Sequence, residues 1–326
     1  MKKVLVLCGG NSSEHKVSLI SAKSILNNID NNLFEASTVI IDYDNKWYEY
    51  GGKVDYLSEW KQQEYEHIDN IVDYLKKYDV VFPITHGTNG EDGKLQGMLD
   101  LFNIKYIGCK TSSSAICMDK DFSKMIFSYL GIPQVPFITI TNKKFKIHDI
   151  IKKLGLPLIV KPANCGSSIG INKANNKKEL KKAIIEAFKY DEKIIIEKFI
   201  KARELECGIL EDKDFYISEI GEILPANEFY DYNAKYENKK SCTTIPAKLT
   251  KEVKDKIIKY VKIAFDGING KGFARIDFFY DEDNGQLYLN EINTLPGFTE
   301  ISMYPKLFAY SGIEYKDLIT KLINNS

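Results

Sequence analysis

Two carboxylates and one amide lie on a pair of apolar segments near the end of the chain. Residues 274–280 and 286–293 are aromatic-rich runs joined by a polar turn that ends in Asn-Gly, which is typical of a β-hairpin. Side chains alternate between the two faces of a strand, so we expect Asp277, Glu291 and Asn293 on one face. Buried carboxylates without a cation are unfavourable, and oxygen ligands of this kind suit Mg²⁺. The hairpin therefore predicts a magnesium site that shares its remaining positions with water and nucleotide phosphates.

The predicted register depends on how the turn closes. If Tyr280 pairs with Gln286, then Arg275 lies opposite Glu291. The same face then has a simpler interpretation, because Arg275 and Glu291 would form an ion pair on the sheet surface. A shift of the register by one residue would separate the acids.

A turn of small residues offers a second kind of chemistry. Lys161 ends an apolar strand at 158–161, and Gly166-Ser167-Ser168 follows it. Backbone N–H groups and hydroxyls that no bulky side chain covers suit a phosphate, to which Lys161 would add a positive charge. The sequence has neither a Walker loop nor a dinucleotide fingerprint. An ordinary β-turn and a solvated lysine are the alternatives.

Three further candidates stand at strand ends. Residues 197–200 follow an apolar run and would offer backbone groups to an adenine, although any strand end has this pattern. His86 opens a loop with three glycines at 86–93; it is either a functional or a structural histidine. Backbone N–H groups around Gly297 follow the predicted metal strand and would hold an oxyanion, with a plain type II turn as the alternative.

The composition is that of an ordinary globular protein. Of its 326 residues 44% are apolar, and Lys plus Arg equals Asp plus Glu at 45 each, so we expect no nucleic-acid or membrane partner. No stretch approaches the roughly 20 apolar residues of a membrane span. The six cysteines are scattered without a Cys-x-x-Cys pair, which suits a reducing cytoplasm.

The elements that must position these groups begin with an alternation of strands and helices. Apolar runs at 4–7, 36–41 and 80–84 are predicted strands, and a helix reaches about residue 28 after Gly9-Gly10. Such alternation favours a parallel sheet with helices on its faces. A sheet of this kind binds ligands beyond the carboxyl ends of its strands.

We expect an α/β fold divided into three units. The first is 1–108, the second is 109–190 with the phosphate turn, and the third is 191–326 with the hairpin. Residues 227–241 are polar and tyrosine-rich with little apolar periodicity. A loop of this length in a compact enzyme is typically a lid or disordered, so it is a predicted lid.

Taken together, these segments resemble those of the D-alanine–D-alanine ligases, which are ATP-grasp enzymes. The resemblance covers nearly the whole chain in matching order and spacing. It is carried by residues 9–19, 86–93, 118–120, 161–162, 166–168, 228–236, 274–279 and 290–299. The resemblance implies a Rossmann-like N-terminal domain with a parallel sheet, and two α+β domains that clamp ATP.

The resemblance also implies roles, position by position. ATP would be bound by Lys120, Lys161, Ser168, Glu197, Lys198, Phe199, Ile200, Glu204 and Lys235. Catalytic groups would be Glu14, Ser167, Tyr236, Arg275 and Gly297. The substrates would contact Glu14, His86, Arg275, Ser302 and Met303. Two Mg²⁺ ions, with Mn²⁺ as a substitute, would be held by Asp277, Glu291 and Asn293.

The implied reaction joins two D-alanine molecules through a D-alanyl phosphate, with release of ADP and phosphate, for peptidoglycan precursors. Lys235-Tyr236 matches the pattern for D-alanine as second substrate, with D-serine or D-lactate as alternatives. A remote alternative is a nucleotide-binding regulator without catalysis, which would be expected to lack a metal ligand, Lys161 or the lid. The family implies a cytoplasmic homodimer that forms through the N-terminal domain.

Overall fold

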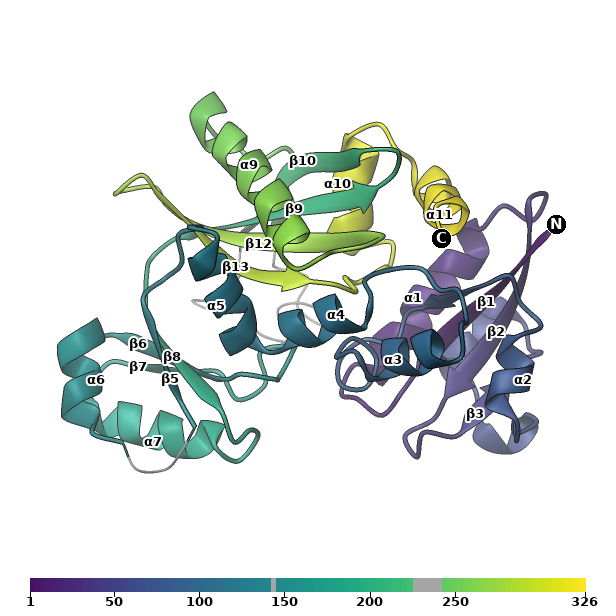
Figure 1. Cartoon of the computed structure of the whole chain (residues 1–326), viewed down its shortest axis with the longest axis horizontal. Helices are drawn as coiled ribbons and strands as arrows, with labels where there is room; N and C mark the ends of the chain where they lie inside the picture. The colour runs from purple at the N-terminus through teal and green to yellow at the C-terminus, as the bar shows by residue number, and fades with distance from the viewer. Residues whose placement is uncertain (142–144, 225–241) are drawn as a thin grey trace.

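The computed structural model describes residues 1–141, 145–224 and 242–326, and three sheets organise this part of the chain. The N-terminal sheet lies at one end of the molecule and a central sheet at the other, with the largest sheet between them (Figure 1). The predicted lid at 227–241 lies outside the described residues. Among the residues that are described, no helix combines the length and apolar character that a membrane crossing requires.

The N-terminal sheet has the strand order β3-β2-β1-β4. Its strands are β1 (Lys2–Gly9), β2 (Phe34–Ile41), β3 (Trp47–Glu49) and β4 (Val80–Pro83). The strands β1, β2 and β4 are parallel, which confirms the predicted sheet, and the short β3 adds an antiparallel edge. The helical segments of this region are α1 (His15–Asn28), η1 (Val54–Glu59), η2 (Gln62–Glu64), α2 (Ile71–Leu75) and α3 (Lys94–Leu101).

The two faces of this sheet have different cores. Leu5 and Leu7 pack toward α2 and α3, whereas Val4 and Val6 pack in a core that also contains residues of α1. The last helix of the chain, α11 (Tyr315–Asn324), contributes to that second core. The Nζ of Lys2 donates to the backbone oxygen of Ile323 over 2.6 Å, and both ends of the chain lie at the side of the N-terminal sheet (Figure 1). The C-terminal helix therefore completes the core of the first sheet.

The central sheet is antiparallel, with the order β5-β8-β6-β7. Its elements are β5 (Phe137–Ile140), α6 (Ile147–Leu154), β6 (Leu158–Pro162), β7 (Asn172–Ala174), α7 (Lys177–Ala187) and β8 (Ile194–Lys198). Alternate residues such as Val160 and Ile196 pack on α6 and α7, and the opposite face presents Lys161 and Glu197. Because β8 pairs with both β5 and β6, this sheet extends to Lys198 and passes the limit expected at residues 190/191.

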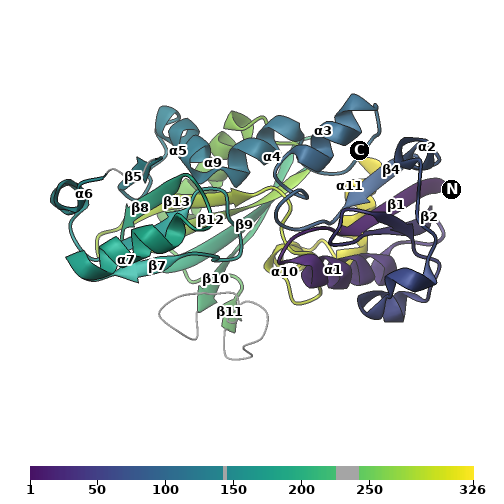
Figure 2. The same ribbon diagram turned by 90° about the horizontal axis from the view of Figure 1, so that it is seen from below.

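The largest sheet is also antiparallel, with the order β11-β10-β9-β12-β13. Its strands are β9 (Arg203–Glu211), β10 (Phe215–Leu224), β11 (Cys242–Thr244), β12 (Phe273–Asp281) and β13 (Gln286–Asn293). One face is covered by α4 (Thr111–Met118), α5 (Lys120–Tyr129) and α9 (Lys251–Gly267) (Figure 2). The other face packs partly on α10 (Met303–Tyr310). The helices α4 and α5 thus pack on this sheet, although the sequence assigned them to the central unit.

The predicted hairpin forms between β12 and β13, but its predicted register is wrong. Gln286 pairs with Asp281 rather than Tyr280, and a bulge shifts the pairing once more, so that Asp277 lies directly opposite Glu291. A bulge inserts one extra residue into one strand of a pair. Together the turn and the bulge shift the pairing by two residues, which leaves every side chain on its original face of the sheet. The acids therefore lie on the same face, as expected.

Gly9 ends β1 in a conformation that favours glycine. Its φ is +84°, and a Cβ atom there would lie 2.2 Å from the backbone oxygen of Ile41. Gly312 has nearly the same φ, +85°, but nothing lies within 4 Å of its added Cβ. An alanine at Gly312 would therefore meet only the free-energy cost of the left-handed backbone, whereas an alanine at Gly9 would meet that cost and a steric clash.

We expect Gly312→Ala to destabilise the protein by about 1–2 kcal/mol through its backbone alone. Gly9→Ala should cost a further amount of about 1–3 kcal/mol, because β1 and β2 must separate to admit the methyl group. The urea midpoint of unfolding, followed by circular dichroism, measures both changes. Equal midpoints for the two variants would contradict the close packing at Gly9.

Candidate functional site

A cavity of about 730 Å³ lies between the polar face of the central sheet and the polar face of the largest sheet. Loops from the N-terminal sheet also line it. All the predicted site residues that the structure describes border this cavity: Glu14, His86, Lys120, Lys161, Ser167, Ser168, Glu197, Lys198, Phe199, Ile200, Glu204, Arg275, Asp277, Glu291, Asn293, Gly297, Ser302 and Met303. Lys235 and Tyr236 lie outside the described residues, so their predicted roles stay predictions.

Arg275 compensates the predicted metal ligands in the structure. Its guanidinium donates twice to Asp277 over 2.8 Å and lies 2.9 Å from Glu206, whereas Asn293 Nδ2 donates to Asp277 over 2.9 Å. Burial opposes the charge of Arg275, but Asp277 and Glu206 raise its pKa well above the usual value. In the register of the hairpin Arg275 lies opposite Asn293 rather than Glu291, and its carboxylate partners at 2.8–2.9 Å are Asp277 and Glu206.

The donor set still fits a magnesium ion. No group of three or more His, Cys, Asp or Glu side chains forms a ready metal site within the described residues. Asp277 and Glu291 are directly opposed, and Asn293 adds an amide oxygen on the same face. Mg²⁺ takes one or two carboxylates and fills its other positions with water and phosphates. A bound cation would take over the charge compensation that Arg275 now provides to Asp277.

The predicted phosphate turn has an unusual backbone. Ser167 and Ser168 have φ values of +50° and +60°, in the left-handed region that costs non-glycine residues about 1–3 kcal/mol each. A Cβ atom on Gly166 would lie 3.5 Å from Glu14 Oε2 and 3.9 Å from Glu91 Oε1. The turn therefore meets two carboxylates from the N-terminal region, of which the sequence predicted only Glu14.

Lys120 lies between the phosphate turn and the hairpin. Its Nζ donates to the backbone oxygen of Cys165 over 2.9 Å and lies 3.7 Å from Glu291 Oε2. The helix α5 that begins at Lys120 is capped by the Asp119 carboxylate, which accepts from the backbone of Asp121. Capping of this kind fixes the first turn of a helix. Lys120 is thus held where it can reach groups from both sheets.

Lys161 does not point to solvent; it pairs with Glu197 over 2.8 Å. A second lysine, Lys124 of α5, pairs with the other oxygen of Glu197 over 2.7 Å, and its side chain is only 1% exposed. Burial raises the pKa of Glu197, but the two lysines outweigh it and bring the pKa to about 2. The sequence analysis missed Lys124. The sequence did contain one indication: Lys124 follows Lys120 by four residues, so the two lysines lie on the same side of the helix.

The strand end at 197–200 lines the cavity, but part of its backbone is already bonded. The N–H of Lys198 donates to Pro136 over 2.9 Å, and that of Phe199 donates to Pro157 over 3.0 Å. The Lys173 ammonium lies 4.0 Å from the centre of the Phe199 ring. These two N–H groups, which the sequence offered to an adenine, instead hold the strand end in place.

His86 is buried and its two ring nitrogens are both engaged. Nδ1 lies 3.2 Å from the backbone oxygen of Leu295, and Nε2 lies 3.0 Å from Ser21 Oγ. A carbonyl can only accept, so Nδ1 carries the proton and Nε2 accepts from the hydroxyl. Burial lowers the pKa of His86 despite the opposing effect of Glu14. His86 therefore ties α1 to the loop that contains Gly297.

Gly297 and Ser302 are close neighbours at the edge of the cavity. A Cβ atom on Gly297 would lie 2.9 Å from Ser302 Oγ, which also accepts from the Thr299 N–H over 3.0 Å. Met303 lines the cavity as well, but it packs mainly with Ile223 and Leu307. Ser302 therefore offers a polar contact next to the predicted oxyanion loop, and Met303 mostly supports α10.

Two more residues of the site escaped the sequence analysis. Glu206 of β9 faces Asp277 across the sheet and shares Arg275 with it. The alternation of acids at 204 and 206 along one strand was its only signal. Glu91 follows the glycines after His86, and its removal from water, together with nearby Glu14, raises its pKa to about 8.

We expect Glu91 to make the unliganded protein less stable as the pH rises. Its pKa of about 8 in the folded state exceeds the ordinary value of 4.5, so the folded state holds the extra proton between these values. Stability should therefore fall from about pH 5 to pH 8 in the wild type, and less steeply in Glu91→Gln. Thermal melting across this range gives the comparison, and parallel curves would refute the raised pKa.

Both halves of the chain match models of known protein families. The family model described as D-ala D-ala ligase N-terminus matches residues 3–109, and the one described as D-ala D-ala ligase C-terminus matches residues 126–324. The D-alanine–D-alanine ligase of Thermoanaerobacter sp. is 46% identical over 346 residues, which cover 99% of this chain and 96% of that protein. The D-alanine–D-alanine ligase of Acetivibrio thermocellus is 44% identical over 357 residues, which cover 99% and 95%.

Solved structures have the same fold. The D-alanine–D-alanine ligase from Coxiella burnetii has a TM-score of 0.88 at 33% identity and covers 99% of this chain and 93% of that one. The D-Ala:D-Ser ligase VanG from Enterococcus faecalis has a TM-score of 0.87 at 34% identity, with coverage of 99% and 98%. These similarities confirm the expected α/β ATP-grasp fold. With both halves matched by family models and full-length relatives above 40% identity, the chain belongs to the D-alanine–D-alanine ligase family.

Proposed function

We propose that this protein joins two D-alanine molecules to D-alanyl-D-alanine at the expense of ATP, and so supplies peptidoglycan synthesis. The observation that carries the proposal is a single cavity that unites the acidic hairpin, two lysines and a strained turn of small residues. These groups suit a magnesium nucleotide, and family membership gives the reaction. A regulator without catalysis would be expected to lack a metal ligand, Lys161 or the lid. Among the described site residues, the three proposed metal ligands and Lys161 are all present in the cavity, which argues against this alternative.

In the first half of the reaction, an oxygen of the first D-alanine carboxylate attacks the γ-phosphorus of ATP. The bond between the γ-phosphorus and ADP breaks, and D-alanyl phosphate forms. Lys120 and Lys161 would offset the charge of the phosphates, and the N–H groups around Ser167 and Ser168 would orient them. Mg²⁺ held by Asp277, Glu291 and Asn293 would supply further charge stabilisation when bound.

In the second half, the amine of the second D-alanine attacks the activated carbonyl carbon. The nitrogen loses one proton and keeps the other as the amide hydrogen, the bond between carbon and phosphate oxygen breaks, and the leaving phosphate takes up the proton. Arg275 and the N–H groups around Gly297 would stabilise the oxyanion of the tetrahedral intermediate. Glu14 would bind the ammonium of the first substrate, and Ser302 would receive the carboxylate of the second. A hydrogen-bonded triad of Glu14, Ser167 and Tyr236 would close the lid and exclude water.

D-Alanine is the proposed second substrate. The curated relatives at 44% and 46% identity are named D-alanine–D-alanine ligases, whereas the D-Ala:D-Ser ligase among the solved structures is 34% identical. The Lys235-Tyr236 pattern points the same way, although it lies outside the described residues.

Three finer features belong to the proposal as well. We expect two Mg²⁺ ions, replaceable by Mn²⁺, a homodimer through the N-terminal domain, and a cytoplasmic location. Five cysteines whose side chains the structure describes carry free thiols, which supports a reducing compartment: Cys8, Cys109, Cys117, Cys165 and Cys207. Sedimentation equilibrium would test the dimer, and phosphate release with each metal would test the substitution.

The proposed reaction predicts which substrates release phosphate from ATP. With Mg²⁺ and D-alanine alone, phosphate should appear in step with a product that has the mass of D-alanyl-D-alanine. Added D-serine or D-lactate should leave that dipeptide as the main product. Mass spectrometry checks the products. Tight ATP binding without turnover would instead revive the regulator, and efficient formation of D-alanyl-D-lactate at neutral pH would reassign the second substrate.

The acidic hairpin should be required for turnover. Glu291→Gln removes one proposed metal ligand, so we expect kcat to fall by at least about 100-fold. Glu282→Gln makes the same change on the turn of the same hairpin, where the carboxylate is 64% exposed and pairs with Arg203. That control should change kcat by less than about twofold. Equal rates for both variants would remove Glu291 from the metal site.

A further inference from the structure

A fully buried lysine, Lys124, contacts the polar face of the central sheet that lines the cavity. Lys124 lies on α5, and its ammonium pairs with Glu197 over 2.7 Å and lies 5.1 Å from the centre of the Phe137 ring. Burial lowers the pKa of Lys124, and Glu197 counteracts this effect. A buried ammonium is costly unless an anion compensates it. A leucine or methionine would fill this space at lower cost, so the charge itself needs an explanation.

Glu197 is shared between two lysines of different kinds. The register of the central sheet places Glu197 opposite Ile159, two residues before Lys161 on the same strand, so Glu197 and Lys161 share the face that lines the cavity. Lys161 Nζ lies 2.8 Å from one oxygen of the carboxylate, and Lys124 holds the other. The cluster thus contains two positive charges and one negative charge.

We propose that Lys124 is a positioning residue of the nucleotide site, which keeps Glu197 compensated and thereby leaves Lys161 available to a nucleotide phosphate. The inference rests on the proposed function, because it assigns Lys161 to ATP. With Lys124 present, Lys161 can leave the carboxylate and a neutral Lys124–Glu197 pair remains buried. Without Lys124, the departure of Lys161 would leave a buried anion alone, which is strongly unfavourable.

The surroundings fix Lys124 in place. It lies one helical turn after Lys120, whose backbone N–H donates to Ala163 over 3.0 Å. Lys193 pairs with Asp119 at the start of the same helix over 2.6 Å. The carbonyl of Lys124 also accepts from Gln134 Nε2 over 2.9 Å. The start of α5 is therefore anchored to the central sheet, and the ammonium of Lys124 reaches Glu197 from a fixed backbone.

The test compares ATP binding in a double-mutant cycle of the full-length protein. Lys124→Met should raise both the dissociation constant and the KM for ATP by about tenfold or more, because Glu197 then retains Lys161. The value of kcat should change less. In a Glu197→Gln background, adding Lys124→Met should change the dissociation constant by less than about twofold, since no carboxylate remains to compensate. Lys124→Arg keeps the charge and should restore part of the affinity.

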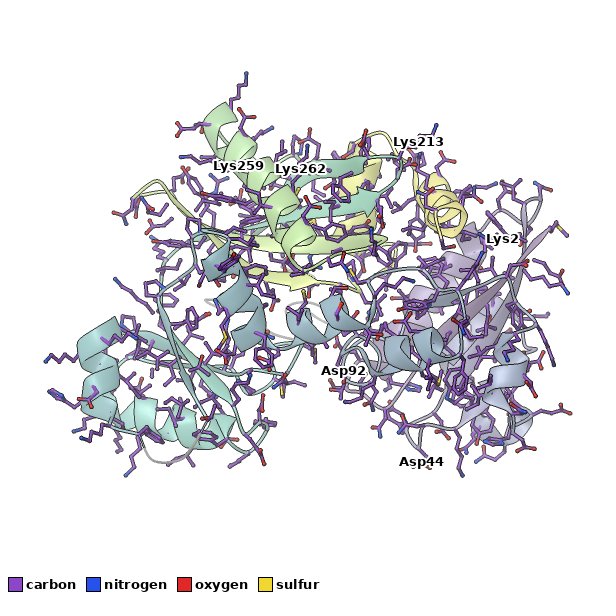
Figure 3. The ribbon with its side chains drawn as sticks, viewed as in Figure 1. Lys2, Asp44, Asp92, Lys213, Lys259 and Lys262 are labelled. Atoms are coloured by element: carbon purple, nitrogen blue, oxygen red, sulfur yellow. The ribbon has the colours of Figure 1, made fainter. Side chains whose placement is uncertain are left out.

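Lys259→Met serves as the matched control, since Lys259 is an exposed lysine on α9 (Figure 3). It should bind ATP as the wild type does. If Lys124→Met fails to fold, the double variant lacks the buried anion and still reports on ATP binding against Glu197→Gln.

An equal loss of affinity in both backgrounds would overturn the inference, and so would wild-type affinity in Lys124→Met. A wild type that neither binds ATP nor releases phosphate would overturn the proposed function and the inference with it.

Discussion

Two buried ions of the cavity, Arg275 and Lys161, are compensated by carboxylates. Arg275 is buried between Asp277 and Glu206, and Lys161 is paired with Glu197. An uncompensated ion in such a place would cost several kcal/mol, so the protein fills each position with a group of opposite sign. A magnesium nucleotide carries both signs itself. In the proposed function its binding would exchange partners: the cation would replace Arg275 beside Asp277, and the phosphates would replace Glu197 beside Lys161.

This constraint explains how the two antiparallel sheets face each other. Each has an apolar face, covered by α6 and α7 or by α4, α5 and α9, and a polar face that lines the cavity. The alternation of side chains along a strand produces both faces from the same segments. The packing of α5 against the largest sheet, with Lys120 and Lys124 directed to the central one, brings the two polar faces to one site.

Local pattern predicted the hairpin well but not its pairing. The acids lie on the expected face because the turn and the bulge each shift the register by one residue. Ion-pair partners that come from distant segments of the chain were harder to predict from the sequence. Glu206 of β9 meets Arg275 of β12, and Lys124 of α5 meets Glu197 of β8. The sequence analysis placed β8 in the third unit, but β8 pairs with β5 and β6 in the interior of the central sheet, because sequence order does not determine which sheet a strand joins.

The contact between the two chain ends affects the order in which the protein forms during synthesis. The strands of the first sheet precede the other two sheets in the chain, yet one of its faces is covered by α11, which follows all three sheets. Until α11 is made, apolar side chains such as Val4, Val6 and Ile25 lack part of their covering. The N-terminal region therefore completes its core only after α11 has been synthesised, and chaperones that bind exposed apolar segments have that interval in which to act.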